Sequence, residues 1–104
     1  MLEAAVFKAL SDPTRLALFE RLGGRELTVV ELTRGGAISQ PAVSQHLAAL
    51  RAAGLVSERR HGRNAFYRQA PDGLAPLTDF VERQRRFWPE KIEKLKDVLR
   101  DMEP

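Results

Sequence analysis

The chain contains no cysteine, only two histidines, and no apolar run long enough to cross a membrane. The absence of cysteine excludes disulfides, thiol nucleophiles and metal sites built on thiolates. The first residues, MLEAAVFKALSDP, lack the basic start, the long apolar stretch and the cleavage site of a secretory signal. The length of 104 residues suits one domain, residues 1–104, with a single hydrophobic core. We therefore expect a single-domain cytoplasmic protein.

The positive charge is concentrated in the middle third of the chain. The whole chain carries a formal net charge of +3. Residues 39–70 contain five arginines and only one acidic residue, Glu58, whereas the flanking segments are close to neutral. A basic patch within a balanced domain indicates a polyanionic partner such as nucleic acid. A solvated surface strip would give the same composition, so charge alone leaves both readings open.

Short turn signals divide the first half of the chain into expected helices. Residues 2–10 place apolar side chains on one helical face. A second helix is expected from Pro13 to the glycine pair Gly23-Gly24. The spacing of Thr28 and Glu31 is that of a capping box, which predicts a short third helix.

A fourth helix is expected over residues 40–53, with Ser39 as its N-cap and Gly54 at its end. Its buried stripe has helical spacing and comprises Val43, Leu47 and Leu50. The opposite face is polar or small and comprises Gln40, Ser44, Gln45, Ala48 and Arg51. Such a face suits the floor of the DNA major groove, where base edges present donors, acceptors and thymine methyl groups.

After Gly54 the pattern changes to two strands, residues 55–60 and 65–69, joined by a turn at Gly62. Four arginines lie on this hairpin or its turn: Arg59, Arg60, Arg63 and Arg68. We expect them to contribute salt-dependent affinity for phosphates more than choice of sequence. Arg63 and Asn64 form the tip, where an arginine can also enter a narrow minor groove.

Residues 74–102 return to helix, with an apolar stripe close to a heptad repeat and Pro89 expected to kink or divide it. The expected fold is therefore mainly α with a small antiparallel β-hairpin. Its element order, α-α-α-α-β-β-α, is that of a winged helix-turn-helix. The candidate DNA-contacting residues are Ser39, Gln40, Ser44, Gln45, His46, Arg51, Arg59, Arg60, Arg63 and Asn64.

The chain resembles the ArsR-type family of bacterial transcriptional regulators. The stretches that carry the resemblance are 38–47, 50–56 and 60–63 in the middle third, together with 9–15 near the start. The resemblance covers roughly residues 5–100. It implies a homodimeric repressor that binds a palindromic operator in double-stranded DNA at the nucleoid. It also implies pairing through the first and last helices. On that basis the expected dimer-interface residues are Leu2, Val6, Leu77, Val81, Trp88, Ile92, Leu95 and Leu99.

Several alternatives stay open at this point. His46 flanks the buried stripe and could be a core-edge histidine or a DNA contact, and Arg51 could pair with Glu58 instead of DNA. Trp88 could line an effector pocket instead of a dimer core. A winged-helix module that binds protein without reading DNA is the alternative function.

The family's metal-sensing sites are not expected, because the third helix has no cysteine and the last helix has no histidine. No metal and no cofactor are therefore predicted, and no inducer can be carried over. The sequence also lacks a phosphate-binding glycine loop and a nucleophile elbow, so an enzyme is not expected.

Overall fold

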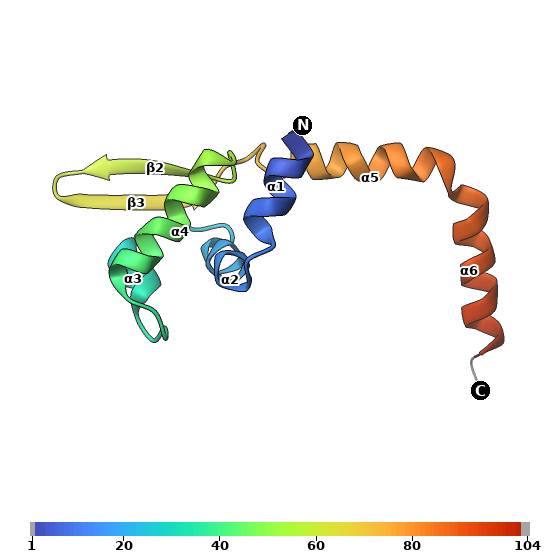
Figure 1. Cartoon of the computed structure of the whole chain (residues 1–104), viewed down its shortest axis with the longest axis horizontal. Helices are drawn as coiled ribbons and strands as arrows, with labels where there is room; N and C mark the ends of the chain where they lie inside the picture. The colour runs from blue at the N-terminus through green and yellow to red at the C-terminus, as the bar shows by residue number, and fades with distance from the viewer. Residues whose placement is uncertain (1, 103–104) are drawn as a thin grey trace.

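The computed structural model describes residues 2–102 and shows a cluster of helices with a small antiparallel hairpin on one side and a long, bent helical segment on the other (Figure 1). The elements in chain order are α1 (Leu2–Leu10), α2 (Pro13–Leu22), β1 (Leu27–Thr28), α3 (Val29–Thr33), α4 (Gln40–Ala52), β2 (Val56–His61), β3 (Asn64–Gln69), α5 (Ala75–Phe87) and α6 (Pro89–Asp101). The expected fold class, mainly helical with a hairpin between the fourth helix and the last helical segment, is confirmed.

The sheet has one strand more than the sequence predicted. β3 lies in the centre, with β2 on one side and the short β1 on the other. β1 pairs antiparallel with β3, placing Leu27 opposite Tyr67 and Thr28 opposite Phe66. A strand of two residues is too short to show an alternating pattern in sequence. Its pairing covers the edge of β3 that a two-stranded hairpin would leave open.

The core lies where α1, α2, α3 and α4 meet the base of the sheet. The largest fully buried side chains are Leu22, Leu32, Leu47, Leu50, Leu55, Val6 and Val43. Val6 was expected at a dimer interface, but its exposed fraction is only 1%. The residue faces inward because α1 packs on both α2 and α4. Leu2 is exposed, and the Phe7 ring contacts Phe80 of α5 edge to face, with ring centres 5.4 Å apart.

The C-terminal helical segment extends away from this body (Figure 1). The long helix is divided, since α5 ends at Phe87 and α6 begins at Pro89 after a non-helical Trp88. Every residue of α6 is exposed. The radius of gyration is 17.9 Å, compared with about 13 Å for a compact chain of this length. Among residues 2–102, no helix is both long and apolar enough to cross a bilayer.

Candidate nucleic-acid interface

The helix α4 is fixed at both ends by local chemistry. The Ser39 hydroxyl accepts a hydrogen bond from the Ala42 N–H at 3.3 Å, and Pro41 lies in the first turn, where its missing N–H costs nothing. Gly54 follows the helix with φ at 78°, a left-handed value that favours glycine. The Leu55 N–H then returns to the Leu50 carbonyl at 3.0 Å. The chain therefore leaves α4 directly into β2.

The two faces of α4 lie as the periodicity predicted. Val43, Leu47 and Leu50 are fully buried. The outward residues are all exposed, namely Gln40, Ser44, Gln45, Ala48 and Arg51. The amide and hydroxyl groups of Gln40, Ser44 and Gln45 make no side-chain hydrogen bond within residues 2–102, so they are free to bind base edges. His46 is half-buried at the border between the two faces.

The preceding helix α3 has only five residues, and side chains hold it at both ends. At its start, the Thr28 hydroxyl accepts the Glu31 N–H at 3.1 Å, while Glu31 accepts the Thr28 N–H at 3.0 Å. The Thr28 N–H lowers the pKa of Glu31 below its usual value. At its end, the Arg21 guanidinium donates to the carbonyls of Leu32 and Glu31 at 2.6 and 3.1 Å. The contribution of Arg21 was not predicted, because it spans ten and eleven residues of sequence.

The hairpin of β2 and β3, residues 56–69, forms a wing beside α4 (Figure 1). Its register pairs Val56 with Gln69 at the base and His61 with Asn64 at the tip. Gly62 turns the chain with a φ of 62°. Arg63 and Asn64 are exposed there and make no side-chain hydrogen bond or ion pair with any described residue. The tip therefore presents an unneutralised positive charge.

The other candidate arginines are held by carboxylates. Arg59 forms a two-point ion pair with Glu26, at 2.7 and 3.2 Å, and its guanidinium lies 4.7 Å from the centre of the Phe66 ring. Glu58 lies 3.0 Å from Arg60 and 3.5 Å from Arg51. In the structure Arg51 therefore pairs with Glu58, which is the alternative named in the sequence analysis. Two carboxylates, those of Glu26 and Glu58, therefore pair with three arginines of the wing and α4 and neutralise two of the three positive charges.

Tyr67 completes this cluster from the central strand. Its hydroxyl donates to Glu58 at 2.5 Å. Burial, together with this bond to a carboxylate, raises the pKa of Tyr67 to about 12. The Tyr67 hydroxyl and the neighbouring Arg60 keep the pKa of Glu58 below its ordinary value. Glu58 is therefore ionised at neutral pH.

The described residues also bear on metal binding. The sequence contains no cysteine. Within residues 2–102, no group of three histidine, aspartate or glutamate side chains lies close enough to hold an ion. The described residues therefore offer no set of cysteine and histidine ligands for a soft or borderline metal ion.

The chain resembles known proteins in both sequence and structure. A family model described as a helix-turn-helix domain matches residues 10–59. The HTH-type transcriptional regulator Rv2034 of Mycobacterium tuberculosis is 45% identical over 82 residues, which are 79% of this chain and 74% of that protein. The arsenic resistance transcriptional regulator ArsR1 of Pseudomonas putida is 47% identical over 70 residues, 64% of this chain. This chain matches 53% of that longer relative.

A solved structure gives the same result. The winged helix-turn-helix DNA-binding domain Mb0332 of Mycobacterium bovis, described as homodimeric and as a possible ArsR-family regulator, is 32% identical. Its TM-score is 0.66, with 78% of this chain and 75% of that chain covered. The chain belongs to the ArsR family of transcriptional regulators. The resemblance expected from residues 9–15 and from the stretches between 38 and 63 is confirmed, and the family consists of transcriptional regulators.

In this ArsR-family chain the candidate contact residues fall into three groups. Those on α4 and at the wing tip are exposed and free, namely Gln40, Ser44, Gln45, Arg63 and Asn64. Those held by an acid are Arg51, Arg59 and Arg60. Ser39 caps α4, and His46 is half-buried. The pairing of Glu26 with Arg59 was not predicted, whereas Glu58, the one acid among residues 39–70, was expected as an alternative partner of Arg51.

Proposed function

We propose that this chain is a homodimeric repressor that binds a palindromic operator in double-stranded DNA and does not sense metal through cysteine or histidine. The observation that carries the proposal is the exposed, unpaired polar face of α4 beside a basic wing. Gln40, Ser44 and Gln45 would read base edges in the major groove. Arg63 and Asn64 would contact phosphates or the minor groove beyond it.

The dimer is inferred from apolar surface that the single chain leaves uncovered. Helix α6 has 13 residues, all exposed, and an isolated helix of that length is marginal in water. Ile92, Leu95 and Leu99 form a stripe along it, and each is at least 40% exposed. A helix with such a stripe gains stability by packing it against a second surface. A second copy of the chain would supply that surface.

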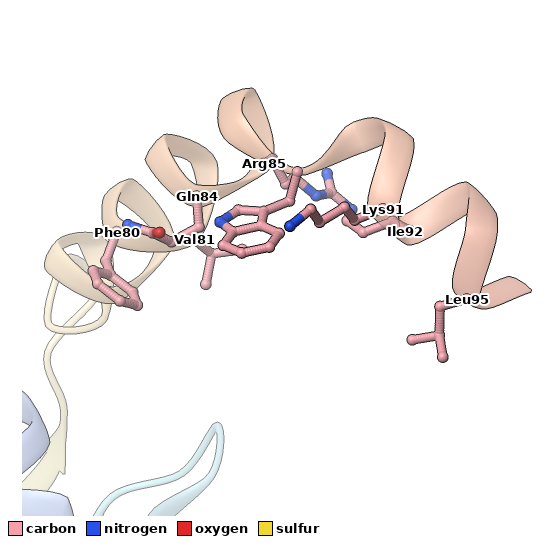
Figure 2. Close-up of a pocket in the computed structure, with 8 residues that line it drawn as sticks. Phe80, Val81, Gln84, Arg85, Lys91, Ile92 and Leu95 are labelled. Atoms are coloured by element: carbon pink, nitrogen blue, oxygen red, sulfur yellow. The ribbon is translucent and has the colours of Figure 1, made fainter.

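The same apolar surface continues across the bend between α5 and α6. A groove of about 490 Å³ lies there, lined by Phe80, Val81, Gln84, Arg85, Trp88, Lys91, Ile92 and Leu95. Figure 2 shows Phe80 and Val81 of α5 and Leu95 of α6 projecting to the concave side of the bend. We assign this surface, with Leu2 and the outer part of Leu77, to the dimer contact. Trp88 then lies within the contact, and Val6 lies outside it.

The chain would act as one unit, with α4 and the wing on DNA and the terminal helices on the partner subunit. A regulator of this kind acts on the chromosome, so we place the protein in the bacterial cytoplasm at the nucleoid. Selection of bound sequences from a random DNA pool tests the proposal. A symmetric consensus with half-sites about one helical turn apart is expected. Enrichment of no sequence would favour a protein-interaction module instead.

A further inference from the structure

Glu58 pairs with two of the candidate DNA-contacting arginines at once, Arg51 and Arg60. One carboxylate oxygen lies 3.0 Å from the Arg60 Nε, and the other lies 3.5 Å from an Arg51 nitrogen and 2.5 Å from the Tyr67 hydroxyl. The Glu58 side chain is only 12% exposed, whereas those of Arg51 and Arg60 are 58% and 71% exposed. The acid therefore lies beneath the arginines, whose outer N–H groups still face solvent.

The three partners of Glu58 come from different elements. Arg51 lies in the last turn of α4, Arg60 on β2 and Tyr67 on β3. The carboxylate is thus a link between the helix proposed to read bases and the wing proposed to hold phosphates. Tyr67 is buried and lies opposite Glu58 in the strand register, so it supports the carboxylate from the protein side.

We propose that Glu58 is a positioning residue that orders Arg51 and Arg60 for phosphate contacts in one register on the DNA. This inference rests on the proposed function. A free arginine side chain loses rotamer freedom when it binds, and a side chain already held in place loses less. Phosphate contacts carry no sequence information themselves but fix the register in which base contacts form. Arginines ordered by Glu58 would therefore favour the operator over random DNA.

The substitution Glu58→Gln distinguishes the ordering of Arg51 and Arg60 from the effect of net charge on DNA affinity. Glutamine has the same size and keeps one oxygen for the Tyr67 hydroxyl, but its second polar atom is a donor that cannot accept from arginine. The change also removes one negative charge per subunit, which by itself strengthens binding to any duplex. The specificity ratio, affinity for the operator divided by affinity for random duplex, is therefore the informative quantity.

Glu26→Gln is the matched control. It removes the same charge and releases another wing arginine, Arg59. Glu26 precedes β1, and it makes no side-chain hydrogen bond or ion pair with α4 in the described part of the chain. This control is expected to raise the affinity for the operator and the affinity for random duplex by the same factor, which leaves the specificity ratio unchanged.

The experiment measures the affinity of the intact dimer for the selected operator and for random duplex over a series of salt concentrations. Glu58→Gln is expected to lower the specificity ratio about tenfold, the equivalent of one charge-assisted hydrogen bond. A ratio equal to that of the Glu26→Gln protein would overturn the inference. A wild-type protein with no preference for any sequence would instead refute the proposed function itself, and the inference with it.

A second variant, Arg51→Met, tests the same link from its other end. Arg51 is exposed, so its replacement is compatible with folding, and thermal unfolding checks this for every variant. Arg51→Met alone is expected to lower the specificity ratio, and an unchanged ratio would contradict the inference even if Glu58→Gln does not fold. In the Arg51→Met background, Glu58→Gln should lower the specificity ratio by a smaller factor than it does in the wild type. An equal loss in both backgrounds would show that Glu58 does not act through Arg51 and would contradict the proposed link between α4 and the wing.

Discussion

Replacement of Arg63 by alanine should weaken DNA binding by an amount that depends strongly on salt. Arg63 lies at the wing tip, is exposed, and makes no ion pair with any described residue. Its charge is therefore fully available to a phosphate. Each phosphate contact contributes about 0.9 to the slope of log affinity against log salt. A dimer loses two contacts, so the slope should become shallower by about 1.8.

This change of slope has a measurable size. Between 50 and 200 mM salt, a slope difference of about 1.8 changes the ratio of wild-type to variant affinity by about twelvefold. Fluorescence anisotropy titrations at four or five salt concentrations would resolve it. The loss should be similar for operator and random duplex, because a phosphate contact carries no sequence information.

The control for Arg63→Ala is Arg86→Ala, which removes the same charge from α5, away from α4 and the wing. Its salt slope should stay close to that of the wild type. A ratio of wild-type to Arg63→Ala affinity that stays constant across the salt series would refute the placement of Arg63 on phosphate. An equal change of slope for Arg86→Ala would show that net charge, and not the wing tip, governs binding.

Three further predictions concern stability and assembly. Leu47→Ala removes a fully buried side chain and should lower the free energy of unfolding in urea by about 2–5 kcal/mol; a loss under 1 kcal/mol would contradict the core described above. The folded protein should lose about 2–3 kcal/mol of stability as pH rises from 10.0 to about 12, because Tyr67 ionises more readily when unfolded. Tyr67→Phe should remove that alkaline loss, and an identical pH profile would count against the buried hydroxyl. Leu95→Glu should convert the dimer to monomer in light scattering, whereas Lys94→Glu, which adds the same group at a neighbouring charged position, should leave it dimeric.

The local features of this chain follow from short stretches of sequence. The buried stripe of α4, the Ser39 cap and the left-handed Gly54 each depend on residues within about one turn of helix, so periodicity and capping rules find them. The resemblance to the ArsR family likewise rests on short local stretches, 9–15, 38–47, 50–56 and 60–63. The division of the last helix at Pro89 is likewise a local effect of the proline ring.

The tertiary structure alone decided which charges are free and which faces are covered. β1 pairs with β3 across about forty residues, and Glu26 meets Arg59 at a separation of 33 residues. Val6 and Leu2 share one short helix, yet only Val6 is buried, because the packing of α1 on α2 and α4 determines which side faces inward. Ion pairs and burial depend on where distant segments meet and on the direction of each side chain. The periodicity of one segment does not contain that information.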